Sequence, residues 1–167
     1  MDDDTNAEVN NEQPPASNAN LDNSQPLDFC LRLARAYAVL IRRFDNSLGN
    51  HHGLSFGDFM LLLQLYRAPG ERLRRVDLAE RVGLTASGVT RSLLPLEKIG
   101  LITRQADTRD ARASYAVLTP SGKTMLVNAL VSAELVAQDA LQSLPAKQIP
   151  TLSGLLGQLA GIHAGNS

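Results

Sequence analysis

The stretch Asp107-Thr108-Arg109-Asp110-Ala111-Arg112 lies between two short runs of β-prone residues, 101–104 and 115–119. Branched and aromatic side chains in these runs, bounded by Gly100 and Pro120, predict a two-stranded hairpin. The arginines at its tip carry fixed charges on flat, forked donors, which suit phosphates and the narrow minor groove of DNA. The alternative is a solvated turn whose Asp and Arg residues pair only with one another, because surface ion pairs are common and weak.

The segment before the hairpin has the pattern of two helices joined by a tight turn. Gly83 can adopt the left-handed conformation of such a turn, and Thr85 offers a side-chain oxygen to cap a second helix. Ala79 is small where the helices approach, and Val89 can pack between them. Four apolar residues of the first helix recur at helical spacing: Val76, Leu78, Ala79 and Val82. Together these features are typical of a helix-turn-helix.

The second helix begins with small and polar residues that could enter a major groove of double-stranded DNA. They are Thr85, Ala86, Ser87, Gly88, Thr90 and Arg91. The guanidinium of Arg91 can hydrogen-bond a guanine or a phosphate.

The end of this second helix is expected to pack into the core and then to bend. We expect its later apolar residues to face inward: Leu93, Leu94, Leu96 and Ile99. Pro95 removes one helical hydrogen bond, so the helix is expected to run to about Leu94 and the chain then to turn toward the hairpin. Gly100-Leu101 is a typical C-terminal stop.

Four segments resemble the MarR family of bacterial transcription regulators in order and spacing: 78–85, 89–91, 96–102 and 107–122. The resemblance covers roughly 27–162 and departs from the family at Pro95, where a polar or charged residue is more common. It implies a repressor in which Asp110 braces the wing, Arg112 reaches the minor groove and Arg109 is a second basic tip residue.

The expected fold class is mainly α with a small β-wing. A winged helix-turn-helix lobe is expected over 55–119, and long helices over 27–54 and 120–162 are expected to form a dimerisation lobe. The first 26 residues are acidic and contain few apolar side chains, so residues 1–26 are expected to be a disordered tail, with a second short tail at 163–167. The acidic tail either solubilises the chain or competes weakly with DNA.

Charge is distributed unevenly along the chain, although the formal net charge is only −1. Residues 67–123 hold 11 Lys or Arg against 6 Asp or Glu, a net charge of +5. Residues 1–28 hold 7 acidic residues and no Lys or Arg, a net charge of −7. The positive charge therefore lies where contacts with DNA phosphates are expected.

The long helices at both ends carry more apolar surface than one chain is expected to cover. Helices are predicted over Leu27–Leu48, Phe56–Tyr66, about Pro120–Leu144 and about Ala146–Gly161. The surplus predicts a homodimer, which would place two recognition helices in successive major grooves of a near-palindromic site, about 34–36 Å apart. The alternative is a monomer whose last helices fold back on its own first helix.

The effector implied by the family resemblance is a small aromatic or phenolic ligand held between the dimer helices and the DNA lobe. Helical position alone suggests its contacts: Tyr37, Arg42, Arg43, His51 and His52. His51 and His52 could be metal ligands, but adjacent histidines in a loop are more often simply solvated. We therefore expect no metal and no cofactor.

Cys30 offers an alternative signal, because some members of the family sense oxidants through a cysteine at the start of the first helix. A helix N-terminus favours the thiolate, which is the reactive form. Against this, position 34 is Ala, where a tyrosine partner would be required. The competing expectation for Cys30 is a buried, inert thiol.

Other classes of function lack their motifs. There is no His-Glu-x-x-His, Cys-x-x-Cys or Gly-x-Ser-x-Gly pattern, so an enzyme is not expected. No long uncharged apolar run or signal peptide is present, which predicts no membrane contact and a cytoplasmic location. A winged-helix module that binds protein instead of DNA is disfavoured by Arg91, Arg109 and Arg112.

Overall fold

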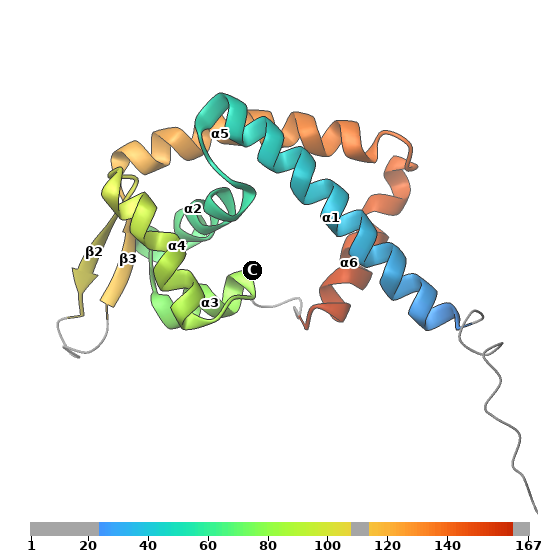
Figure 1. Cartoon of the computed structure of the whole chain (residues 1–167), viewed down its shortest axis with the longest axis horizontal. Helices are drawn as coiled ribbons and strands as arrows, with labels where there is room; N and C mark the ends of the chain where they lie inside the picture. Colours follow the sequence, from blue (N-terminus) through green and yellow to red (C-terminus); the bar gives the residue numbers. More distant parts are fainter. Residues whose placement is uncertain (1–23, 108–113, 162–167) are drawn as a thin grey trace, which may run out of the picture. The chain divides into compact units, whose positions relative to one another are not determined.

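The computed structural model describes residues 24–107 and 114–161, and the chain divides into two compact units between Ala38 and Val39. Among the described residues, the first unit holds the beginning of α1 and the second holds all the other elements. The elements in chain order (Figure 1) are α1 (Gln25–His52), α2 (Phe56–Arg67), the 3-10 turn η2 (Pro69–Glu71), β1 (Arg72–Arg74), α3 (Arg75–Val82), α4 (Ala86–Lys98), β2 (Ile102–Ala106), β3 (Ser114–Leu118), α5 (Pro120–Leu141), the 3-10 turn η3 (Ala146–Gln148) and α6 (Ile149–Leu159). The chain is mainly α with a small sheet, which confirms the predicted fold class.

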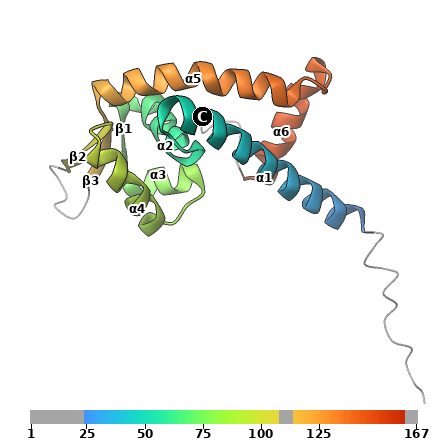
Figure 2. The ribbon, with the colours of Figure 1, turned by 45° about the horizontal axis from the view of Figure 1, so that its top comes forward.

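Helix α2 is the centre of the second unit. Ser55 and Asp58 form a reciprocal capping box at its start, which satisfies two backbone N–H groups that have no partner inside the helix. The helix packs against α3, α4, α5 and β3, and lies between α5 and the α3–α4 pair in both views (Figures 1 and 2). Four of its side chains are buried in the core, each stabilising the fold by roughly 1.5–3 kcal/mol: Phe59, Leu61, Leu62 and Leu65.

Helices α3 and α4 form the predicted helix-turn-helix. Gly83 has a φ of 67°, the left-handed conformation expected of the turn, and the Leu84 N–H donates to the Ala79 carbonyl. Ala79 and Val89 are buried, as the pattern required. Val76, in contrast, is an exposed residue and not part of the core.

Helix α4 differs from the sequence prediction in two respects. It continues through Pro95 to Lys98, so the expectation that it would stop near Leu94 is wrong. Leu93 and Leu96 on either side of Pro95 are buried and hold this last turn against the core, while Pro95 itself is exposed. Leu94 and Ile99 are 55% and 62% exposed, so they do not face the core as expected.

The sheet has three strands and not two, in the order β1-β3-β2 with antiparallel pairing throughout. The hairpin of β2 and β3 was predicted, and β1 was not, because three residues are too few to show an alternating pattern. Leu73, Ala116, Leu118 and Ile102 are buried and line the inner face of the sheet. The sheet thereby closes one side of the core.

The start of α5 crosses the turn between α4 and β2. The Thr119 side chain caps α5 by accepting from the Gly122 N–H, and its hydroxyl also lies 2.7 Å from the Gly100 carbonyl oxygen. A Cβ on Gly122 would lie 2.0 Å from the Leu101 carbonyl oxygen, so only glycine permits this close approach.

Helix α5 has a buried and an exposed apolar side, whereas α6 has no buried residue. Leu126, Ala129 and Ala133 of α5 are buried in the core. The helices end at Leu141 and Leu159, earlier than predicted, and η3 separates them. Side chains on other sides of both helices stay exposed: Val127, Val131, Leu135, Leu152, Leu155, Leu156 and Leu159. None of the described helices is long and apolar enough to cross a membrane.

Candidate nucleic-acid interface

The first turn of α4 is exposed and is held by bonds to its own backbone. Thr85 accepts the Gly88 N–H at 3.0 Å and lies 3.2 Å from the Ser87 hydroxyl. Gly88 gives the cap room, because a Cβ there would lie 3.1 Å from the Thr85 hydroxyl oxygen. This turn has no side chain longer than that of Thr85, so its backbone could approach the floor of a groove.

The next turn of α4 places two further polar side chains beside this surface. Thr90 donates its hydroxyl hydrogen to the Ala86 carbonyl at 2.9 Å, so in this arrangement its oxygen can only accept from a partner. Arg91 is exposed and makes no hydrogen bond or ion pair with any other described residue. Its five N–H donors are therefore available for a base edge or a phosphate.

The loop end of the hairpin, where β2 ends and β3 begins, carries a polar cluster that the sequence analysis missed. Arg74, the last residue of β1, donates to the Asp107 carboxylate at 2.6 Å and to the Tyr115 hydroxyl at 3.4 Å. Hydrogen bonds to Tyr115 and to Asp107 raise the pKa of Arg74 above its ordinary value. The Asp107 side chain is only 7% exposed. These partners are 33 and 41 residues away in sequence, so no local motif reports them.

Arg72 lies on the same sheet face as Arg74. Its guanidinium carbon is 5.0 Å from the centre of the Tyr115 ring, and it donates to the Gln105 side chain at 3.1 Å. Arg74 approaches the same ring at 5.7 Å, so two cations flank one tyrosine. This face of the sheet is therefore positively charged next to the hairpin.

Arg75, the first residue of α3, connects that helix to the end of α4. Its guanidinium donates to Glu97 at 3.0 Å, and both side chains are largely buried, at 17% and 24% exposed. Such a pair fixes the angle between two helices because breaking it leaves a partly desolvated charge. Arg74 and Arg75 thus reach in different directions, one toward the hairpin and one toward α4.

The predicted tip residues Arg109, Asp110 and Arg112 lie outside the described residues, as do the predicted tails up to residue 23 and from residue 162. The described parts of the hairpin, β2 and β3, belong to the same unit as α4, and β2 packs directly against it. The structure therefore brings the start of α4 and the loop end of the hairpin into one lobe.

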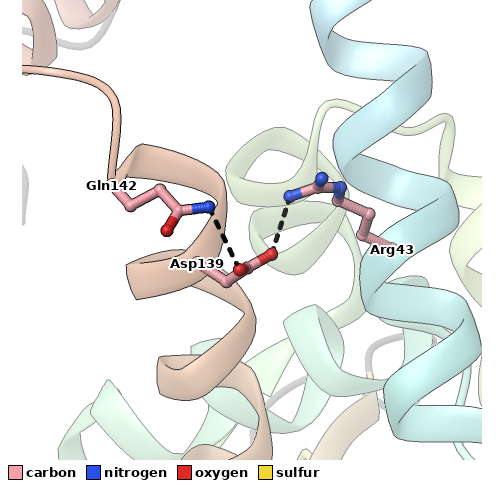
Figure 3. A network of polar contacts seen from close by, with 3 residues as sticks. All are labelled: Arg43, Asp139 and Gln142. Atoms are coloured by element: carbon pink, nitrogen blue, oxygen red, sulfur yellow. Dashed lines mark hydrogen bonds and ion pairs between the residues drawn. The ribbon is translucent and has the colours of Figure 1, made fainter.

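The suggested effector residues are only partly brought together. Arg43 on α1 pairs with Asp139 on α5 at 3.0 Å, and Gln142 donates to the same carboxylate (Figure 3). Arg43 and His51 line a shallow hollow of about 510 Å³ between α1 and α5 together with Asn46, Ser47, Asn50, Leu135, Val136 and Asp139.

The other three suggested effector residues do not line this hollow. Arg42 is exposed, and His52 lies 2.8 Å from the Ser132 hydroxyl. Tyr37 belongs to the first unit and is also exposed.

Two remaining candidates are a metal site and a reactive thiol. Within residues 24–107 and 114–161 no three His, Cys, Asp or Glu side chains are grouped so as to hold a metal ion. His51 instead bonds the Ser47 carbonyl of its own helix. Cys30 is exposed, so the expectation of a buried thiol is wrong for the single chain.

Comparisons with known proteins agree with this arrangement. The sequence model of the MarR family matches residues 54–114. The HTH-type transcriptional repressor YetL of Bacillus subtilis is 36% identical over 74 residues, which span 44% of this chain and 44% of YetL. The uncharacterized HTH-type transcriptional regulator YkoM of the same organism is 29% identical over 140 residues, or 80% of this chain and 88% of YkoM.

Solved structures show the same fold. Sco3205, a MarR family transcriptional regulator from Streptomyces coelicolor in complex with DNA, superposes with a TM-score of 0.76 at 24% identity, covering 86% of this chain and 92% of that chain. CouR from Rhodococcus jostii RHA1 bound to p-coumaroyl-CoA superposes with a TM-score of 0.73 at 17% identity, covering 83% and 95%.

Proposed function

The chain belongs to the MarR family of winged helix-turn-helix transcription regulators, and from this premise we propose that it is a homodimeric repressor of a near-palindromic DNA site, released by a small aromatic or phenolic ligand. Regulators of this family bind DNA and are not enzymes. The proposal places the protein in the cytoplasm, where it reaches bacterial DNA.

The observation that carries the proposal is the exposed start of α4 beside a hairpin in a basic lobe. The first turn of α4 presents Ala86, Ser87 and Gly88, and the exposed guanidinium of Arg91, which pairs with no other described residue, follows. We assign these groups, with Thr85 and Thr90, to the major groove, and Arg109 and Arg112 to the minor groove with Asp110 as their brace. The net charge of +5 over residues 67–123 supplies the attraction for phosphates.

Support for the homodimer comes from the exposed apolar side chains of α5 and α6. Val127, Val131 and Leu135 recur every four residues and form one stripe along α5. Four leucines of α6 are exposed as well, at positions 152, 155, 156 and 159. Exposed apolar side chains in such number are typical of an oligomer contact, and two-fold symmetry buries them on both copies. In this proposal residues 27–54 and 120–162 form the dimerisation lobe and 55–119 the DNA lobe.

DNA binding is tested by a salt-titrated assay on the intergenic duplex beside the protein's own gene. Arg91→Ala is expected to weaken binding by about 1–3 kcal/mol and to relax sequence preference, because Arg91 reads a base. Arg112→Ala is expected to weaken binding to all sequences and to lower the salt slope by about 1, because it removes a positive charge from the negatively charged minor groove. Weak, sequence-blind binding that neither substitution changes would favour a protein-interaction module.

The ligand proposal rests on the hollow between α1 and α5. One side of it presents Arg43 and polar groups of α1, and the other presents Leu135 and Val136, so it suits a flat apolar body with an anionic end. A ligand carboxylate would replace Asp139 as the partner of Arg43. Release occurs only to the extent that the ligand prefers the DNA-free form.

The ligand proposal is tested by titrating salicylate and p-coumarate into the protein–DNA complex. Release that Arg43→Met abolishes and Arg42→Met preserves would support the hollow, since both substitutions remove one exposed charge from the same helix. Equal responses of the two variants would place the effector elsewhere.

A second candidate signal is oxidation of Cys30, because its thiol is exposed. Peroxide would convert an accessible thiolate to a sulfenic acid. Loss of DNA binding in peroxide that Cys30→Ser prevents would support this signal. Identical behaviour of the two proteins in peroxide would exclude it.

A further inference from the structure

At the loop end of the hairpin, one guanidinium joins three separate segments. Arg74 comes from the end of β1, Tyr115 lies directly opposite it in β3, and Asp107 follows the last residue of β2. The Arg74 Nη2 to Asp107 Oδ2 distance is 2.6 Å, and Nε reaches the Tyr115 hydroxyl at 3.4 Å. Residues 108–113, the tip of the hairpin, follow Asp107 directly in the sequence.

The burial of Asp107 makes this contact a strong constraint. A carboxylate that is 7% exposed needs charged or hydrogen-bonding partners, because desolvation without them is costly. A charge-assisted bond of this length holds both side chains in one geometry more firmly than a neutral hydrogen bond. The direction of the chain at Asp107 is thereby tied to Arg74.

Arg74 also lies directly before the helix-turn-helix. It is the residue that precedes α3, and its side chain makes no capping bond to that helix. Instead the side chain reaches the hairpin, while its neighbour Arg75 bonds Glu97 near the end of α4. A continuous chain of contacts therefore links α4, the start of α3 and the loop end of the hairpin.

We propose that Arg74 is a positioning residue for DNA recognition: by holding the Asp107 carboxylate against the start of α3, it sets the direction of the wing relative to α4. Arg74 acts through the wing and not through a DNA contact of its own. The inference rests on the proposed function, because it concerns how the DNA-reading wing is aimed.

The test uses a substitution for which the loss of charge and the loss of positioning are expected to change DNA affinity in opposite directions. Asp107→Asn removes a negative charge near DNA, which by electrostatics alone would tighten binding. Loss of the Arg74 pairing would instead weaken it, and we expect a loss of about tenfold, within the usual range for coupled neighbours. The matched control is Asp77→Asn, which removes the same charge from an exposed position of α3 and is expected to leave affinity unchanged or slightly higher.

Affinity is measured with the full-length protein on a duplex that the wild type selects from a random pool. In an Arg112→Ala background we expect Asp107→Asn to change affinity by less than about twofold, because the wing contact is already lost. A second pair compares Arg74→Met with Arg72→Met, which removes the same charge from the same sheet face without touching Asp107. Arg74→Met is expected to lower DNA affinity more than Arg72→Met does. Arg74→Lys, which keeps the charge, is expected to lower it by an intermediate amount.

The outcomes separate the two proposals. Failure of the wild type to select any sequence would contradict the proposed function itself. Selection by the wild type with Asp107→Asn binding as tightly or more tightly would overturn the positioning role. So would multiplicative losses from Arg74→Met and Arg112→Ala, since they would mean that Arg74 contacts DNA independently. If Asp107→Asn fails to fold, the Arg74 and Arg72 variants decide the same question.

Discussion

The start of α4 and the loop end of the hairpin belong to one lobe, but their stabilising contacts join residues at very different separations in the sequence. At the start of α4, Thr85 bonds Gly88 and Thr90 bonds Ala86, so no partner is more than four residues away. At the loop end of the hairpin, Arg74 donates hydrogen bonds to Asp107 and Tyr115, which are 33 and 41 residues away in the sequence. The start of α4 is therefore stabilised by contacts within its own sequence, whereas the direction of the hairpin depends on contacts that require the tertiary fold.

The largest expected effect comes from removing the core anchor of α4. Leu93 is fully buried, and Leu93→Ala should lower the free energy of unfolding by about 2–5 kcal/mol, because it removes apolar contacts and leaves a cavity. Leu94→Ala, one residue later at an exposed position, should change it by less than about 0.5 kcal/mol. Chemical denaturation of both variants measures the difference. Similar losses would mean that Leu94 is buried after all, as the sequence pattern suggested.

The next largest effect is expected where the start of α5 lies close to the Leu101 carbonyl, directly before β2. Gly122→Ala should destabilise the fold by about 3 kcal/mol, because the new Cβ would overlap the Leu101 carbonyl oxygen beside the start of β2. The control is Gly154→Ala in α6, where no atom lies within 4 Å of a new Cβ and alanine should stabilise the helix by up to about 1 kcal/mol. Opposite shifts in melting temperature are expected. A neutral Gly122→Ala would show that α5 can move away from the β2 strand without cost.

The smallest effect compares two helix caps of the same residue type. Thr85→Ala removes a local cap and should cost about 1 kcal/mol. Thr119→Ala removes an equivalent cap and also the bonds to the Gly100 and Leu101 carbonyls, so it should cost about 1 kcal/mol more. Serine at either position keeps the hydroxyl and should recover most of the loss. Equal costs would mean that the long-range bonds of Thr119 contribute nothing beyond its cap.

Much of the lobe was predictable because its signals are local. Gly83 at the turn, Thr85 and Thr119 as caps, and the hairpin around Asp107 were all expected and all occur. The third strand was not, since β1 exists only by pairing with β3 more than 40 residues later. The course of α4 after Pro95 was misjudged for a related reason: burial of Leu93 and Leu96 stabilises the last turn by more than the lost hydrogen bond costs.

The sequence by itself determined where helices begin, where the chain turns and which segments form the hairpin, because caps, turn glycines and apolar periodicity act over a few residues. Only the tertiary structure decided which apolar side chains are buried, since Leu93 and Leu94 are chemically identical and differ only in the side of α4 they occupy. It also decided that Arg74 meets Asp107 and Tyr115, because that contact requires three strands in register. Features set by neighbouring residues could therefore be predicted, whereas burial and long-range contacts depend on which elements pack together in the tertiary fold.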